Sequence, residues 1–314
     1  MSAISPPAPA GRSRSSDRRR RKGSGSLPAL LLVPSLIILL GALAYPMVWQ
    51  VITSFQKFGL AQQFGQGADF VGLENYRRIV TDGEVWVVVL RSIGFCLFCA
   101  FTTVLIGGLL ALLMRGVGTV TRAILQVALL LAWAMPVVAT MTVWIWIVDW
   151  RRGLLNWALT HLGVDASGHN WLASPTSFFA VAAAIVVWMS VPFVALSISA
   201  ALTQISPEVL EAASLDGATG IQRVRYIVMP LVAPVLSLVL LLQIVWDLRV
   251  FTQVKFLQDA GGFANQTDVL GTFIYRLGTG SGDFGTASAV SVLMLVLTLL
   301  VSWPYVRSLL KESV

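Results

Sequence analysis

The chain has 314 residues, of which 56% are hydrophobic and only 12% are charged, and its formal net charge is +7. A soluble domain carries about 25% charged residues, so this chain has about half of the charge that usually covers a water-facing surface. This composition excludes an ordinary soluble protein and favours an integral membrane protein. Because the apolar runs are long and continuous, they predict membrane-spanning helices and not the alternating strands of a barrel.

The first 26 residues form a basic segment. Seven arginines and lysines stand between Gly11 and Ser26, against the single acid Asp17. Such a run can bind nucleic acid, but no folded binding domain accompanies it and an apolar run follows at once. We therefore expect no nucleic acid partner, and we predict that residues 1–26 are a disordered cytoplasmic tail that contacts membrane lipid.

The predicted fold class is all-α, a polytopic membrane protein with six transmembrane helices. The spans are expected at residues 27–51, 85–114, 123–148, 178–201, 231–250 and 284–306. The basic segment and the first apolar run, with Ala42–Leu43–Ala44, also fit a cleaved signal peptide, but the run is long enough to span and more spans follow. Arg and Lys are concentrated in the short loops on one side, which predicts that both termini are cytoplasmic. The loops expected on the outer side are longer and could together form a cap.

Motifs for catalysis and metal binding are missing from the sequence. Cys96 and Cys99 have the C-x-x-C spacing of redox and metal sites, but both fall inside a predicted span, where thiols behave as small hydrophobic side chains. His161 and His169 share one outer loop without a cluster of further ligands, so no metal site is expected. The chain contains neither a G-x-x-x-x-G-K-[ST] phosphate loop nor a G-x-S-x-G elbow. We therefore expect no catalytic residue and no ATP hydrolysis by this chain.

A polar segment broken by glycine, EAASLDGATGIQRVRYIVMP, separates the fourth and fifth predicted spans. Its first part is predicted to be a short helix that Ser206 caps, Pro207 begins and Gly217 ends. A second short helix then leads to Pro230 at the start of the fifth span. From its composition alone, the segment also fits an ordinary amphipathic surface loop.

The spacing in this segment resembles the EAA motif of binding-protein-dependent ABC importer permeases, which reads E-A-A, three residues, Gly, nine residues and I-x-L-P. Six positions match in register, with Met229 in place of the Leu: Glu211, Ala212, Ala213, Gly217, Ile227 and Pro230. The sequence VGLENY at residues 71–76 and the segments around the fourth and sixth spans also resemble this family. The likeness covers residue 71 to the C-terminus, and a Gly261–Gly262–Phe263 sequence stands where the family usually has G-G-P. A Gly-Gly element there favours the maltose-permease-F-like branch of sugar permeases.

This resemblance implies the type I ABC importer permease fold, with residues 204–230 as a coupling loop on a separate ATPase. Glu211 would pair with a basic residue of the ATPase, Ala212 and Ala213 would permit a close fit, and Gly217 would supply the turn. The coupling residues implied in this way are Glu211, Ala212, Ala213, Leu215, Asp216 and Gly217.

The resemblance also implies the partners and the domain organisation. The partners are a second permease subunit, an ATPase subunit dimer that holds ATP and Mg, an extracytoplasmic substrate-binding protein and a carbohydrate; this chain itself would hold no cofactor. The location would be the bacterial cytoplasmic membrane. After the tail, we expect a first transmembrane helix and outer loop at residues 27–84, a core five-helix permease domain at 85–307, and a cytoplasmic C-terminal end at 308–314.

The fifth predicted span carries Gln243, Trp246 and Asp247 at i, i+3, i+4 spacing, so the three are expected to share one helix face. An ionisable residue inside a span usually faces a polar pathway or a partner, and an indole beside a carboxylate and an amide suits a sugar. We therefore predict that these residues line the substrate pathway. Asp247 could instead pair with Arg249, with Arg91 or with the partner permease.

Pro136 and Pro192 could bend the third and fourth spans around a cavity. The alternative function is a self-contained secondary transporter or channel that uses Asp247 and Arg91 as its charged elements. Dependence of transport on ATP and on a binding protein would exclude this alternative.

Overall fold

A computed structural model describes residues 26–312 of the chain. Except for its last residue, the basic tail predicted for residues 1–26 therefore lies outside the described residues. The chain divides into two units, Met1–Val48 and Trp49–Val314. The first unit contains α1 (Ser26–Leu39), the π-helical turn η1 (Leu40–Ala44) and the start of α2 (Tyr45–Ser54).

The first predicted span is helical, as expected. Leu31–Ser54 is long and apolar enough to cross a membrane, and its most apolar stretch has no buried residue. Such a helix is suited to a lipid environment for two reasons. Its exposed side chains are apolar, and its backbone polar groups are hydrogen-bonded within the helix.

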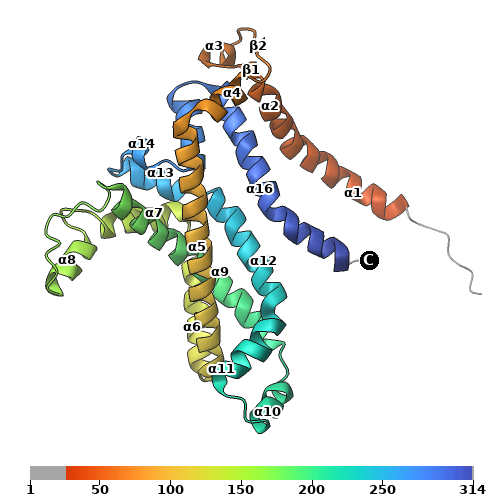
Figure 1. Ribbon diagram of the computed structural model, residues 1–314, viewed down its shortest axis with the longest axis vertical. Coiled ribbons are helices and arrows are strands. Elements are labelled where there is room, and N and C mark those ends of the chain that lie inside the picture. The colour runs from red at the N-terminus through yellow and green to blue at the C-terminus, as the bar shows by residue number, and fades with distance from the viewer. Residues whose placement is uncertain (1–25, 313–314) are drawn as a thin grey trace, which may run out of the picture. The chain divides into compact units, whose positions relative to one another are not determined.

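Four long helices dominate the second unit (Figure 1): α5 (Gly83–Gly116), α9 (Pro175–Thr203), α12 (Met229–Leu248) and α16 (Phe284–Glu312). In the described part of the chain, five helices are long and apolar enough to span a membrane, or up to six if one sharply bent pair is a single span. The prediction of an all-α protein with several membrane-spanning helices is therefore confirmed.

Helices α5 and α9 pack closely against each other at the centre of this unit. Gly107 of α5 permits the approach, since a Cβ atom at this position would lie 2.6 Å from Cγ1 of Val194 on α9. Small residues at helix crossings let the backbones come near enough for extensive van der Waals contact in a membrane.

Buried side chains form three clusters, and α5 contributes to each of them. The first joins Phe95 and Cys99 to α9, to α7 (Val137–Ile147) and to α13 (Thr252–Asp259). The second joins Cys96 to α12 and α16, to α4 (Glu74–Thr81) and to α15 (Leu270–Tyr275). The third joins Ala111 to α9 and α12. Both cysteines are free and buried, as expected for thiols inside a span.

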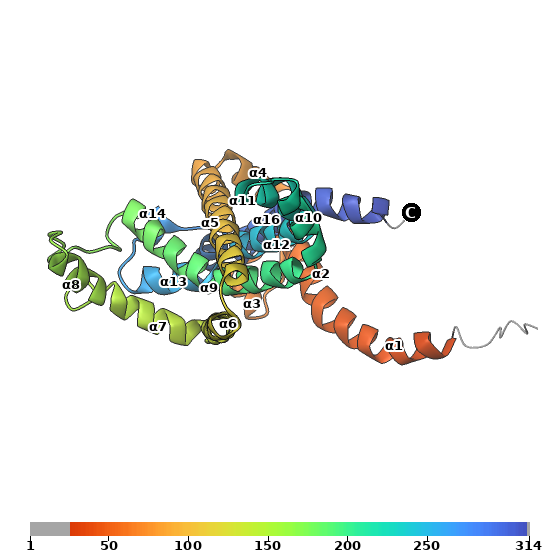
Figure 2. The ribbon, with the colours of Figure 1, turned by 90° about the horizontal axis from the view of Figure 1, so that it is seen from below.

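The third predicted span is not one straight helix, which corrects the expectation for residues 123–148. The chain forms α6 (Thr119–Trp133) and α7 (Val137–Ile147), which meet at an angle of 95°. Figure 2 shows α6 end-on and α7 leaving it sideways. Pro136 lies at the break, with a ψ of 135°. Proline has no N–H for the helix hydrogen bonds and disfavours helical conformation in the residue before it. The helix therefore ends before Pro136 and a new helix begins after it, instead of one helix continuing with a kink.

Short elements connect the long helices. Between α2 and α5 lie β1 (Gln56–Lys57), α3 (Leu60–Gln63), β2 (Asp69–Phe70) and α4 (Glu74–Thr81), and β1 pairs antiparallel with β2. Helix α8 (Leu154–His161) precedes α9, and α13 (Thr252–Asp259), α14 (Ala264–Thr267), α15 (Leu270–Tyr275) and the π-helical turn η3 (Arg276–Gly280) precede α16.

The VGLENY sequence has a structural role in this connection. Asn75 is buried, and its Nδ2 donates to the carbonyl oxygens of Ser54 and Gln56, both at 2.9 Å. The hydroxyl of Tyr76 lies 2.7 Å from Oγ of Ser54. At Gly285 of α16, a Cβ atom would lie 2.4 Å from the carbonyl oxygen of Gln56. The motif therefore ties the end of α2 to α4 and to the start of α16.

Candidate functional site

The EAA segment folds as an elbow between α9 and α12. Its first limb is α10 (Pro207–Leu215), and its second limb is α11 (Gly220–Arg223) with the π-helical turn η2 (Val224–Val228). The elbow lies at the end of the second unit far from β1 and β2 (Figure 1). The second limb continues into α12 through Pro230, without the separate short helix that we expected. A π-helical turn beside a proline is one way in which a membrane helix accommodates the missing N–H.

The first limb begins as predicted at Pro207, but Ser206 does not cap it with its side chain. The Ser206 hydroxyl donates instead to Oε2 of Glu208 at 2.8 Å. The capping role appears one limb later, where Thr219 and Gln222 form a reciprocal capping box at the start of α11. Thr-x-x-Gln is a pattern that could have been found in the sequence.

Gly217 ends the first limb in the left-handed conformation, with a φ of 79°. The N–H of Ala218 donates to the carbonyl of Ala213 and the N–H of Gly217 donates to the carbonyl of Ser214, at 3.0 and 3.1 Å. These two bonds form the Schellman arrangement that closes many helices, which requires positive φ and so favours glycine. The Nη1 of Arg223 then donates to Oγ of Ser214 at 2.8 Å, which links the two limbs.

The elbow exposes most of its motif. Glu211, Ala212, Leu215, Asp216 and Gly217 are exposed, whereas Ala213 is buried. No described residue forms an ion pair with Glu211. Two apolar side chains, Leu215 and Ile221, are 89% and 81% exposed. The elbow thus offers a free carboxylate beside a small apolar surface.

The polar residues of α12 divide between two environments, so only part of the predicted shared face is formed. Gln243 and Asp247 are 0% and 4% exposed, whereas Trp246 is 46% exposed. The ring of Trp246 lies 5.2 Å from that of Phe193 on α9, and Phe193 lies 6.0 Å from Trp133 on α6. An i, i+4 pair stays in line on a helix, but the i+3 residue lies at the edge of the same stripe, where the neighbouring helix decides its exposure.

The buried pair has hydrogen-bonding capacity to spare. Neither amide atom of Gln243 nor Oδ2 of Asp247 has a hydrogen-bond partner among the described residues. Asp247 forms no ion pair with Arg249 or Arg91 there, so these two of its predicted alternative pairings are not formed. A buried polar group without a partner lowers stability by about 1–3 kcal/mol. An ionisable group kept inside a membrane span at such a cost usually serves a function.

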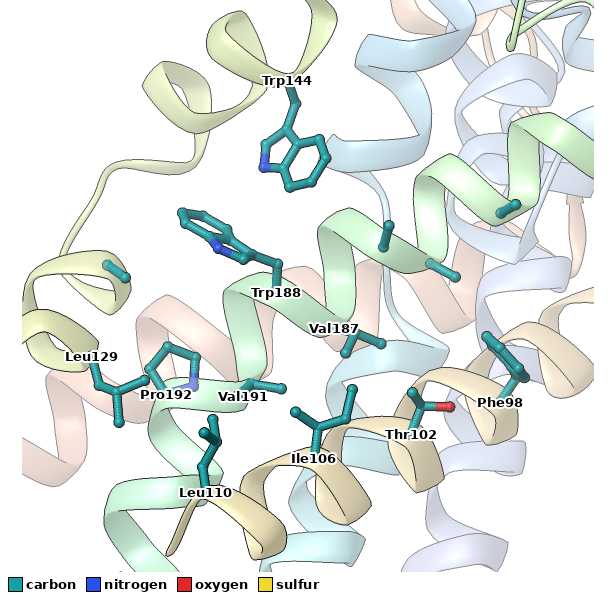
Figure 3. Close-up of a pocket in the computed structure, with 14 residues that line it drawn as sticks. Phe98, Thr102, Ile106, Leu110, Leu129, Trp144, Val187, Trp188, Val191 and Pro192 are labelled. Atoms are coloured by element: carbon teal, nitrogen blue, oxygen red, sulfur yellow. The ribbon is translucent and has the colours of Figure 1, made fainter. Parts of the chain in front are cut away.

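An apolar cavity of about 710 Å³ lies between α5, α9, α6 and α7. Figure 3 shows Trp144 and Trp188 at this cavity, with ring centroids 6.0 Å apart. Pro192 lies in its wall, within the continuous helix α9. Thr102 supplies the lining's hydroxyl group, and most of the other lining side chains are aliphatic or aromatic.

An ion cluster that the sequence did not predict joins α5 to the segment containing α14 and α15. Asp268 is 1% exposed, and its Oδ2 accepts a hydrogen bond from Nε of Arg276 at 2.6 Å. Arg276 also pairs with Glu84 at the start of α5, and Nη1 of Arg91 donates to the carbonyl of Asp268 at 3.0 Å. Burial alone would lower the pKa of Arg276, but its hydrogen bonds to Asp268 and Glu84 hold that pKa above its usual value.

The chain is similar in sequence to known transport proteins. The model of the family described as "binding-protein-dependent transport system inner membrane component" matches residues 103–307. The chain is 36% identical over 297 residues to the diacetylchitobiose uptake system permease protein DasB of Streptomyces coelicolor, across 94% of this chain and 90% of DasB. It is 32% identical over 281 residues to the trehalose/maltose transport system permease protein MalF of Thermococcus litoralis, across 88% of this chain and 92% of that relative.

The fold is also similar to a solved structure. A chain from the crystal structure of a bacterial alginate ABC transporter, in complex with an alginate pentasaccharide-bound periplasmic protein, superposes with a TM-score of 0.75 at 22% sequence identity. The match covers 88% of this chain and 91% of that chain. At this identity the likeness establishes the fold.

Proposed function

Because this chain belongs to the family of binding-protein-dependent transport system inner membrane components, we propose that it carries a carbohydrate, a mono- or oligosaccharide or a polyol. The chain is a multi-pass permease component of an ABC importer. One observation carries the proposal of a carbohydrate: DasB and MalF, whose names state transport of diacetylchitobiose and of trehalose or maltose, match this chain over about nine tenths of its length.

The partners follow from the same proposal. A second permease subunit completes the pathway, an ATPase subunit dimer binds ATP and Mg and hydrolyses the nucleotide, and an extracytoplasmic binding protein delivers the sugar. This chain then has no catalytic role. Both termini lie in the cytoplasm of a bacterium, with the elbow on the same side.

The elbow is the coupling site in this proposal. Glu211 is exposed and without an ion pair among the described residues, so it is free to pair with a basic residue of the ATPase. Leu215 and Ile221 add apolar surface beside it. The Schellman turn at Gly217 and the bond from Arg223 to Ser214 stiffen the elbow, so that a movement of the ATPase is passed to α12 as a rigid-body rotation.

The pathway runs along α12. Gln243 and Asp247 supply hydrogen-bonding groups that no described residue uses, and sugar hydroxyls need such partners. The rings of Trp246, Phe193 and Trp133 form a row beside them, and aromatic faces suit the C–H surface of a sugar ring. Trp246 lies at the edge of the same stripe and is half exposed, which fits a solute held between this chain and its partner permease.

The test is transport by the assembled system. The chain is purified with its second permease and ATPase, reconstituted in proteoliposomes and supplied with the binding protein, and uptake of diacetylchitobiose, maltose and trehalose is measured with and without ATP. We expect uptake of at least one sugar that requires both ATP and the binding protein. ATP-independent uptake by the chain alone would instead establish a secondary transporter.

Glu211→Lys tests the coupling role of the elbow. It places a positive charge opposite the basic residue that we expect on the ATPase, so the two side chains would repel each other. The complex should assemble in the membrane yet lose ATP-dependent uptake, whereas Glu74→Lys, the same exchange at an exposed glutamate outside the elbow, should retain it. Normal uptake by Glu211→Lys would contradict the coupling role. Reporter fusions at Ser26 and after Val314 test the topology, and external activity at either end would overturn it.

A further inference from the structure

A polar hollow lies at α5, apart from the apolar cavity and the buried face of α12. Its volume is about 500 Å³, and its walls come from α5, from the start of α9 and from α14. We call it the Arg91 pocket, and its lining residues are Arg91, Pro175, Thr176, Phe179, Asn265 and Gln266.

Arg91 brings unused donors to this pocket. Its guanidinium has five N–H groups, and in the described part of the chain one nitrogen, Nη1, donates to the carbonyl of Asp268. The nearby acids, Asp268 and Glu84, are both paired with Arg276. Two arginines and two acids balance one another in this cluster, so Arg91 offers directed hydrogen bonds without an excess of positive charge.

The remaining walls provide further polar groups and an apolar face. Thr176, Asn265 and Gln266 are exposed, and their side chains form no hydrogen bond to a described residue. The ring of Phe179 lies beneath the guanidinium, 5.9 Å from Cζ of Arg91, and Pro175 adds a second apolar ring.

A smaller hollow of about 330 Å³ adjoins the pocket and shares Arg91 and Phe179 with it. That hollow in turn shares Phe98 and Ala180 with the apolar cavity. The Arg91 pocket is thus the polar end of a row of hollows along the groove between α5 and α9.

We propose that the Arg91 pocket is a receiving subsite for a neutral saccharide, in which Arg91 and Asn265 bind hydroxyl or acetamido oxygens and Phe179 contacts the sugar ring. The combination of an amide, a guanidinium and an aromatic face matches the alternating polar and C–H surface of a sugar. Because the charges of the cluster balance, the pocket favours a neutral sugar over an acidic one. This inference rests on the proposed carbohydrate transport and adds a site that the pathway on α12 does not include.

The test is protection of an introduced thiol. Gln266→Cys places a thiol in the pocket wall, and Ala260→Cys places a control on an exposed residue of the same connection that does not line the pocket. Cys96 and Cys99 are 2% and 0% exposed, so the native thiols give little background. The full chain is co-purified with its second permease, and the rate of modification by N-ethylmaleimide is measured with diacetylchitobiose, maltose, trehalose or no sugar.

We expect at least one of the sugars to slow modification of the Gln266→Cys variant, with no effect on the Ala260→Cys control. Adding Arg91→Gln should raise the sugar concentration for half-protection by about tenfold or more, because the variant removes a charged hydrogen-bond donor from the pocket. Adding Arg78→Gln, which removes an exposed arginine elsewhere, should leave that concentration unchanged.

Two results would overturn the subsite. One is that no sugar slows the Gln266→Cys variant more than the control, and the other is that protection survives Arg91→Gln unchanged. A sugar that the unmodified complex imports but that does not protect the thiol removes this subsite alone and leaves the proposed transport function intact. Failure of ATP-dependent uptake for every sugar is a separate result, which contradicts the transport function.

Discussion

The ion cluster around Asp268 makes the sharpest prediction about stability, and Asp268→Asn is the perturbation. The carboxylate is 1% exposed and accepts hydrogen bonds from Nε of Arg276 at 2.6 Å and from Nε2 of Gln258 at 3.1 Å. Asparagine keeps the shape of the side chain but removes its charge. Arg276 is then left with Glu84 as its ionic partner among the described residues.

The magnitude follows from the burial of the two partners. Removing one member of a buried ion pair costs about 3–5 kcal/mol. The side chain of Arg276 is 32% exposed and keeps its ion pair with Glu84, so water and this second acid offset part of the cost. We therefore expect the free energy of unfolding to fall by about 2–3 kcal/mol. At about 2 °C per kcal/mol for a large chain, the apparent melting temperature should fall by about 5 °C.

The buried cysteines supply the assay, because a maleimide dye reacts with Cys96 and Cys99 only when unfolding exposes them. Asp259→Asn is the matched control. Asp259 also pairs with a cation, Lys255, but its side chain is 63% exposed, and an exposed i, i+4 pair contributes about 0.5 kcal/mol or less. Equal shifts of the melting temperature in the two variants would refute the reasoning from burial.

Three further predictions concern packing, coupling and the pathway. Gly107→Ala should lower stability by about 1–3 kcal/mol because its Cβ would overlap α9, whereas Gly94→Ala, which meets nothing within 4 Å, should not; the same dye assay compares them. Gly217→Val should abolish ATP-dependent uptake, since a β-branched residue at a φ of 79° costs about 1–3 kcal/mol and opens the turn; uptake at the normal rate would contradict this. Trp246→Ala and Asp247→Asn should each slow uptake per assembled complex, and unchanged values in both would move the pathway to other helices or to the partner.

Hydropathy and length by themselves determined the class of this protein. An apolar run of about 20 residues has few options in a bilayer, because each backbone polar group must be bonded within the segment. Local spacing also determined the elbow, where Pro207 begins a helix and Gly217 ends it with positive φ. These features depend on neighbours in the sequence, so the sequence contains what is needed to predict them.

Tertiary structure decided the features that depend on distant parts of the chain. Whether Trp246 joins Gln243 and Asp247 on the buried face depends on how α9 crosses α12, and the crossing leaves the indole half exposed. A proline such as Pro136 is compatible with a gentle kink or a full break, and the packing of α7 away from α6 selects the break of 95°. Arg276 and Glu84 are 192 residues apart and meet only because the segment before α16 returns to the start of α5. Charge pairs of this kind leave no local periodicity, and only the folded chain brings them together.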